Sequence, residues 1–288
     1  MNIGIGLPST IPGVDRDSLL TWARKAEERG FSTLGTIDRV VYGNYESLIA
    51  LAAAAAVTER IRLTTDILLG PLRGNGAVLA KQAATVDSLS NGRLTLGIAV
   101  GLREDDYEST ATPFNERGRL FDAQLEEMKR IWAGEDRGTA GPIGPPPARE
   151  GGPELVIGGN VSAVIRRVAE YGDGWTMGGG TPDQFKEMSG KIKDAWSEAG
   201  RDGTPRLIAL CYYGLGEGAE EAAKEDLGHY YAWLGDEIAG QIVASAATDA
   251  ETIRGYRDAF AEAGADELIC FPTSTDPAQV DLLADAAL

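Results

Sequence analysis

The feature that most constrains the fold is a regular alternation of short apolar runs with longer segments of helical periodicity. An apolar run rich in branched side chains occurs eight times, and a segment with helical spacing follows each one, directly or after a loop. The apolar runs are NIGIGLP, FSTLGTID, IRLTTDILL, RLTLGIAV, ELVIGG, DGWTMGG, RLIALCYYGL and DELICFPTS. We expect helices over 16–29, 46–57, 76–90, 116–132, 161–171, 182–199 and 249–263, and a last one at the end of the chain. Strands that alternate with helices form parallel sheets, because each crossover brings the chain back to the same edge.

Eight such units in 288 residues predict an α/β protein, a closed (β/α)8 or TIM barrel, for which about 250 residues is typical. We expect one barrel domain over residues 1–288. Residues 133–153, which are rich in proline and glycine and have no periodicity, form an insertion after the fourth helix. Residues 217–246 form a helical excursion after the seventh strand. The alternative is an open doubly wound sheet, but the first-strand segment GIGLPSTIPG does not have the G-x-G-x-x-G spacing of that fold.

The net charge of −17 excludes several classes of partner. An acidic surface repels nucleic-acid backbones and anionic membranes, so we expect neither as a partner. No stretch reaches the roughly 18 consecutive apolar residues of a membrane span. The segment MNIGIGLP reads as a strand without a preceding basic region, so we expect no secretory signal and a cytoplasmic protein.

Cysteine and histidine are too scarce for the common metal sites. Cys211 and Cys270 both lie in apolar runs, which favours buried free thiols over a disulfide or a metal site. His229 is the one histidine of the chain, so a metal site with several histidines is excluded. We therefore expect no metal ligands.

Charged and glycine-rich segments follow the predicted strands. In a barrel of this type, the active site is built from the loops at the carboxyl ends of the strands. The residues in these positions are Asp38, Arg39, Tyr42, Thr65, Asp66, Arg73, Gly101, Arg103, Glu104, Gly158, Gly159, Asn160, 177–181, Thr273 and Ser274. The most charged of these segments, GLREDDYE, either belongs to the site through Arg103 and Glu104 or is part of a solvated loop over 102–117.

Two glycine clusters predict a phosphate site. In IGGNVSAVIRR, Gly158 and Gly159 end a strand and a helix begins near Val161, so bare amide groups at a helix N-terminus are available to an anion. The cluster GGGTPD repeats this arrangement after the next strand, with Thr181 or Asp183 as the N-cap. The alternative is that the glycines serve tight turns alone. A phosphate site without a nucleophile–base pair suggests a cofactor that supplies its own chemistry.

Several long segments resemble one family of enzymes. The segments IRLTTDILLGPLRGNGAVLAKQAATVDSLSNGRLTLGIAVG, PFNERGRLFDAQLEEMKRIW, VIGGNVSAVIRRVAEYGDGW and TIRGYRDAFAEAGADELICFP are similar to segments of the luciferase-like superfamily, in the same order. These proteins are barrel oxidoreductases that use FMN or the deazaflavin F420. The resemblance extends over nearly the whole chain, and it implies the fold and a flavin-type cofactor without specifying a substrate.

The resemblance also implies where the cofactor binds. The ring lies at the carboxyl mouth of the barrel, close to Asp38 and against a bulge in the third strand. Many members have a non-proline cis peptide in this bulge, which here falls between Asp66 and Ile67. Combined with the charged and glycine-rich segments, this gives the cofactor-binding set Asp38, Thr65, Asp66, Ile67, Val100, Gly101, Arg103, Gly158, Gly159, Asn160, Gly178 and Gly179.

The sequence departs from two branches of the family. Arg39 occupies a position that is histidine in the F420-dependent sugar-phosphate dehydrogenases, and Leu102 stands where those enzymes have an acid. The histidine expected near the second strand of true bacterial luciferases is missing as well. These differences argue against alcohol oxidation by that acid–base pair and against light emission.

We therefore expect an enzyme that transfers a hydride from reduced F420 or FMN to an electron-poor C=C or C=N bond of a small organic substrate. The catalytic candidates are Asp38, close to the ring, and Glu104, Tyr42 and His229 as proton donors. One alternative is an FMN-dependent monooxygenase that uses reduced flavin and O2. Another is a flavin-binding protein without catalytic activity.

The cofactor and its supply are the remaining expectations. The chain has no NAD(P)-binding motif, so reduced cofactor must come from an external source. F420 has an anionic tail, and Arg39, Arg73 and Arg103 at the rim could bind it, which favours F420 over FMN. Aromatic residues of the segment GHYYAWLG either cover the pocket or pack in the core. Members of the family often pair through outer helices, so a homodimer is compatible with the resemblance.

Overall fold

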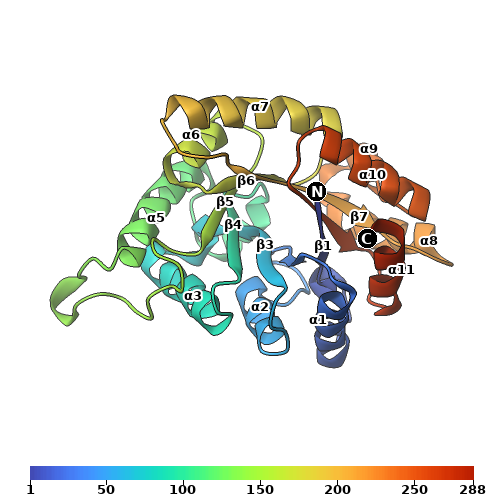
Figure 1. The fold of residues 1–288 in the computed structure, drawn as a ribbon, viewed down its shortest axis with the longest axis horizontal. Coiled ribbons are helices and arrows are strands. Elements are labelled where there is room, and N and C mark those ends of the chain that lie inside the picture. Colours follow the sequence, from blue (N-terminus) through green and yellow to red (C-terminus); the bar gives the residue numbers. More distant parts are fainter.

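The computed structural model describes residues 1–288 and shows a closed barrel of eight parallel strands. The strands pair in chain order, and the last pairs with the first. Their bounds are β1 Asn2–Gly6, β2 Thr33–Thr36, β3 Arg62–Leu69, β4 Leu94–Ala99, β5 Glu154–Gly158, β6 Gly174–Met177, β7 Arg206–Tyr213 and β8 Glu267–Pro272. The helices lie outside the ring of strands (Figure 1). The predicted (β/α)8 barrel is confirmed, and the open sheet is excluded.

The helices lie close to their predicted positions. They are α1 Arg16–Arg29, α2 Ser47–Ala55, α3 Gly76–Leu89, α4 Glu104–Ser109, α5 Arg117–Trp132, α6 Ser162–Tyr171, α7 Pro182–Glu198, α8 Ala219–Tyr231, α9 Asp236–Ala244, α10 Ala250–Glu262 and α11 Ala278–Ala287. The ends of α1 show how the sequence sets these bounds. The Asp15 carboxylate accepts a hydrogen bond from the amide of Ser18, and Gly30 ends the helix with a φ of 89° that other residues rarely adopt.

Three segments between these elements were predicted as insertion, excursion or loop. Residues 133–153 contain no strand and only one short 3-10 turn, as expected. The excursion after β7 consists of α8, a 3-10 turn at Ala232–Leu234 and α9. The alternative of a solvated loop over 102–117 does not hold for the whole segment, because α4 lies within it. Three acidic residues occupy the first turn of α4, where negative charge complements the helix dipole.

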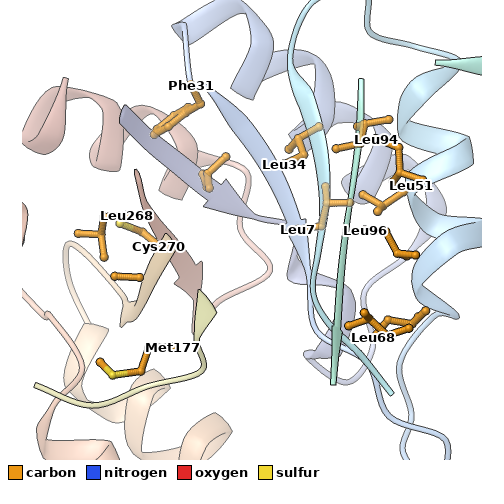
Figure 2. Close-up of a cluster of buried hydrophobic side chains, with 14 of the residues drawn as sticks. Leu7, Phe31, Leu34, Leu51, Leu68, Leu94, Leu96, Met177, Leu268 and Cys270 are labelled. Atoms are coloured by element: carbon orange, nitrogen blue, oxygen red, sulfur yellow. The ribbon is translucent and has the colours of Figure 1, made fainter. Parts of the chain in front are cut away.

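Alternating residues of the strands face two different layers of the core. On β7, Leu207 and Ala209 belong to a cluster of 56 buried residues that fills the space between strands and helices. Figure 2 shows part of this cluster, with Leu96 of β4 and Leu51 of α2 among the labelled side chains. Ile208 belongs to a separate small cluster, which therefore lies inside the barrel.

The barrel interior is filled at its centre and at its amino-terminal end. A Cβ atom at Gly6 would lie 2.2 Å from the ring of Phe271, so the ring occupies space that glycine leaves free. At the amino-terminal end, Arg206 forms ion pairs with both Glu154 and Glu267. These groups close that end, so the carboxyl end is the open one.

Two further features bear on the predicted classes of site. None of the helices has the length and apolar content needed to cross a bilayer. No group of three or more His, Cys, Asp or Glu side chains is arranged to hold a metal ion. Cys211 and Cys270 are buried and free, with their sulfur atoms 3.5 Å apart.

Candidate active site

A cavity of about 330 Å³ lies at the carboxyl ends of the strands. Its volume is in the range of small-molecule sites, roughly 300–1,000 Å³. The residues of the predicted cofactor set that line it are Asp38, Asp66, Ile67, Val100, Gly101, Arg103, Gly158, Gly159, Asn160, Gly178 and Gly179. Thr65 is the exception, because its hydroxyl donates a hydrogen bond of 2.7 Å to the carbonyl of Gly97 instead. Folding thus brings residues from five strand ends to one cavity.

The bulge in β3 is present. The pairing register between β3 and β4 shifts between Thr65 and Leu68, and the peptide bond between Asp66 and Ile67 is cis, as the resemblance implied. Strand β4 carries Gly97 here, where a Cβ atom would lie 2.0 Å from the carbonyl oxygen of Thr65. The glycine allows the bulge to press against β4. Both Asp66 and Ile67 therefore reach the cavity lining.

Asp66 is a buried acid with incomplete hydrogen bonding. Its side chain lies at the cavity although the residue is only 3% exposed. One carboxyl oxygen accepts a hydrogen bond of 2.9 Å from the hydroxyl of Thr176, and the other has no partner. Burial raises the pKa of Asp66 to about 7, and the hydroxyl of Thr176 opposes the shift while the charge of Glu267 adds to it. Asp66 therefore exchanges its proton near neutral pH.

The two glycine clusters differ in what their helices offer an anion. Helix α6 begins after Val161, which makes no side-chain hydrogen bond to the first turn, so the amides of Ser162 and Ala163 stay available, whereas that of Val164 donates to the carbonyl of Val161. Gly159, with a φ of 121°, turns the chain into this helix along the cavity wall. At α7, Thr181 and Gln184 form a capping box, in which the side chain of each accepts a hydrogen bond from the amide of the other. The N-cap of α7 is therefore Thr181, and α6 is the helix of the two that no side chain caps.

Two other carboxylates on the cavity wall are paired. The carboxylate of Asp38 lies 2.5 Å from the guanidinium of Arg73, and that of Asp106 lies 2.7 Å from the guanidinium of Arg39. All four side chains are largely buried. Among the carboxyl groups on the lining, Asp66 is thus the one that no cation neutralises.

The three rim arginines that were predicted to bind an anionic tail are each paired with carboxylates. Arg39 pairs with Asp106, and Arg103 pairs with Asp105 at 2.5 Å. The third, Arg73, pairs with Asp38 and Glu46. The acidic segment after β4 supplies two of these partners. This segment positions and neutralises Arg39 and Arg103.

The predicted proton donors lie outside the cavity lining. Glu104 is exposed and borders a separate surface hollow together with Phe114. The hydroxyl of Tyr42 and Nδ1 of His229 are 3.0 Å apart, so folding joins two candidates that are 187 residues apart in sequence. Neither of them lines the cavity, because the ring of Tyr230 lies beside Tyr42 on the cavity side, with ring centroids 5.1 Å apart.

Aromatic side chains also line the cavity. Tyr230, Tyr231 and Trp233 line the cavity, as expected if this segment covers the pocket. Tyr212 joins them, and its hydroxyl lies 2.6 Å from that of Tyr231. Burial raises the pKa of both phenols. Sequence analysis missed Tyr212, although its inward position follows from its spacing to Ile208 on the same strand.

Comparison with protein families gives one match over most of the chain. The model of the family described as luciferase-like monooxygenase matches residues 1–269. Among curated relatives, an uncharacterized protein of Mycobacterium tuberculosis is 33% identical over 172 residues, which is 56% of this chain. The chain covers 60% of the length of that relative.

Solved structures share the fold. The monooxygenase RslO1 from Streptomyces bottropensis has a TM-score of 0.79 at 24% identity. The match covers 99% of this chain and 98% of RslO1. An F420-dependent secondary alcohol dehydrogenase in complex with an F420–acetone adduct also has a TM-score of 0.79, at 19% identity. The match covers 99% of this chain and 97% of the dehydrogenase. The oxygenating constituent of 3,6-diketocamphane monooxygenase from Pseudomonas putida, in complex with FMN, has a TM-score of 0.74 at 17% identity. The match covers 99% of this chain and 96% of that protein.

Proposed function

Because this chain belongs to the luciferase-like monooxygenase family, a family of oxidoreductases, we propose that it transfers a hydride from a reduced flavin-type cofactor, F420 or FMN, to an electron-poor C=C or C=N bond. The observation that carries the proposal is the uncapped N-terminus of α6, on the wall of the one cavity at the carboxyl mouth that also contains the β3 bulge. A phosphate at α6 and a ring at the bulge are the two ends of one flavin-type molecule.

The residues present fit such a cofactor. A Cβ atom at Gly158 would lie 2.0 Å from the Cδ1 atom of Ile67, so glycine is required where the phosphate turn meets the bulge. Gly159 presents its backbone next to α6 without a side chain. The cofactor supplies the redox chemistry when bound, since its reduced ring donates the hydride.

The chain's own residues would bind and orient the cofactor and shield it from water. Amides at the start of α6 would hold the phosphate, and Ile67 would contact the ring. Tyr230, Tyr231 and Trp233, which line the same cavity, would exclude water from it. Asp66 holds a proton at a carboxyl oxygen within this cavity, and reduced cofactor comes from an external source.

A second function is FMN-dependent monooxygenation with O2, and one observation favours the cofactor that it requires. The three rim arginines are already neutralised by carboxylates, so the preference for the anionic tail of F420 loses its support. FMN has one phosphate, and the α6 N-terminus suffices for it.

One experiment separates the functions. Purified protein is mixed with reduced F420 or reduced FMN and a panel of enones and imines, first without O2 and then with it. Oxidation of the cofactor with reduction of the acceptor in the absence of O2 supports hydride transfer. Turnover of reduced FMN that needs O2 and gives an oxygenated product supports the monooxygenase. Binding without turnover of any kind supports a flavin-binding protein and contradicts the proposal.

A further inference from the structure

A second hollow of about 360 Å³ adjoins the cofactor cavity. The two share part of their walls, including Tyr212, Tyr231 and Trp233. Beyond this shared wall the second hollow is enclosed by β7, α9 and α10, with Ile242 and Phe260 among its lining residues. We call it the side chamber.

The side chamber has no charged side chain in its lining. This is notable in a chain with a net charge of −17. An ionised ligand would lose its hydration there without gaining a counter-ion, which costs several kcal/mol by order of magnitude. The chamber therefore discriminates against charged molecules.

Two phenols on the shared wall form a hydrogen bond with each other. The hydroxyls of Tyr212 and Tyr231 are 2.6 Å apart, so one of them donates its hydrogen to the other. The accepting phenol keeps its own hydrogen, which no other group in the structure takes. Because burial raises the pKa of both phenols, this hydrogen stays in place at neutral pH. The pair thus offers one hydrogen bond to an acceptor oxygen.

The glycines after β6 keep the chamber open toward the cavity. Gly178 and Gly179 line both hollows, and a Cβ atom at either position would meet no atom within 4 Å. The N-terminus of α7, which follows these glycines, is capped by Thr181. Their lack of side chains leaves a passage between the two hollows.

We propose that the side chamber is the substrate site and that it takes an uncharged aromatic compound whose oxygen accepts a hydrogen bond from the Tyr212–Tyr231 pair. The assignment as a substrate site rests on the proposed function. A molecule in the chamber lies next to the cavity that holds the β3 bulge, since the two hollows share a wall. Aromatic walls, the absence of charge and the donor of the phenol pair together define the ligand class.

Three probes of equal ring size test this ligand class: 2-naphthol, naphthalene and the anion 2-naphthoate. Their dissociation constants are measured by calorimetry on the full chain without added cofactor. We expect 2-naphthol to bind at least about tenfold more tightly than 2-naphthoate, and also more tightly than naphthalene. Equal affinity for 2-naphthol and 2-naphthoate would overturn the proposal, and equal affinity for naphthalene would overturn the role of the phenol pair.

Two variants on the same helix locate the binding site. Ile242→Phe fills the chamber, and we expect it to weaken 2-naphthol binding about tenfold while the affinity for FMN or F420 is unchanged. Ile238→Phe is the control, because Ile238 lies one turn earlier on α9, is 46% exposed and does not line the chamber. Equal loss in both variants, or no loss in Ile242→Phe, would place the probe elsewhere and overturn the proposal.

The outcome for the chamber is separable from that for the cofactor. If neither cofactor binds the wild type while the probe results hold, the proposed function fails and the chamber stands as a binding site alone. If a cofactor binds and supports turnover while the probes show no preference, the chamber proposal fails and the proposed function stands. With turnover established, Ile242→Phe is expected to raise KM for a neutral aromatic acceptor and leave its kcat within about twofold.

Discussion

Asp66 and Thr176 lie on strands that are not neighbours in the barrel, and the hydrogen bond of 2.9 Å between them crosses its interior. Strand β3 carries the acid and β6 carries the hydroxyl. The remaining carboxyl oxygen has no partner, and burial raises the pKa of Asp66 to about 7. A carboxyl group in this state is protonated in weakly acidic solution and ionised in weakly alkaline solution. The charge of Glu267, which forms an ion pair with Arg206, raises this pKa further.

This state predicts how stability depends on pH. The unfolded chain ionises Asp66 near pH 4, whereas the folded protein keeps the proton up to about pH 7. The unfolded state therefore binds fewer protons between these values, so Asp66 lowers the free energy of unfolding as the pH rises through this window. The effect is at most about 4 kcal/mol and is constant above the folded pKa. Asp66→Asn is expected to remove it, so the variant gains stability relative to the wild type at pH 8 and not at pH 4. Urea unfolding at both values measures the difference.

Thr176→Val is the matched control for this prediction. The hydroxyl of Thr176 lowers the pKa of Asp66, so its removal is expected to raise that pKa further and to extend the window upward. A wild-type pH profile in Asp66→Asn would mean that Asp66 is ionised throughout and would contradict the assignment.

Val161→Asp is expected to have opposite effects on folding and on cofactor binding. Val161 is the N-cap of α6, is 57% exposed and makes no capping hydrogen bond. An aspartate there can accept from the free amides of the first turn and interact favourably with the helix dipole, which stabilises the protein by about 1 kcal/mol. The same carboxylate occupies the phosphate site and repels the phosphate, so FMN affinity is expected to fall at least about tenfold. Thermal unfolding and fluorescence titration measure the two effects.

The control for this variant is Val161→Ala, which introduces neither a cap nor a charge. We expect its FMN affinity to remain within about twofold of that of the wild type. If Val161→Asp stabilised the protein and kept full affinity for FMN, the phosphate would bind at a site other than α6.

Glu104→Gln is expected to leave turnover and cofactor affinity within about twofold of the wild type. Glu104 is exposed on the first turn of α4 and borders a hollow outside the cavity. The assay is steady-state turnover with whichever cofactor the protein uses, compared across pH 6 to 9. A loss of an order of magnitude, with an altered pH profile, would restore Glu104 as the proton donor that its position after β4 first suggested.

The barrel itself could be predicted because its signal is local and repeated. Each strand is an apolar run of a few residues, each long helix has an apolar face, and α1 has its cap and its stop in the sequence at Asp15 and Gly30. Helix α4 was missed because its signal is of another kind. Its residues EDDYES have no apolar periodicity, and it is favoured by charge at its N-terminus.

The pairing within the site could not be predicted, because it depends on contacts between distant residues. Arg39 and Asp106 are 67 positions apart and meet only when β2 and β4 are closed into the same ring. The sequence shows three arginines on the rim, but it does not show that acidic side chains occupy their guanidinium groups. Likewise, the two glycine clusters look alike in sequence, and the difference between them is a capping box at Thr181.

Asp38→Ala tests whether the acid next to the predicted ring site acts in chemistry or in folding. Its carboxylate pairs with Arg73 and accepts a hydrogen bond of 3.0 Å from the amide of Leu69, and both contacts tie the loop after β2 to the end of β3. Removing it leaves Arg73 with Glu46 alone, so we expect the free energy of unfolding to fall by about 3–5 kcal/mol. The double variant Asp38→Ala/Arg73→Ala is expected to recover part of this loss, because the buried guanidinium that lost one of its two carboxylate partners is removed as well. Urea unfolding of Asp38→Ala, Arg73→Ala and the double variant measures the coupling. Wild-type stability in Asp38→Ala together with lost turnover would instead assign Asp38 to the reaction, as its position near the ring originally implied.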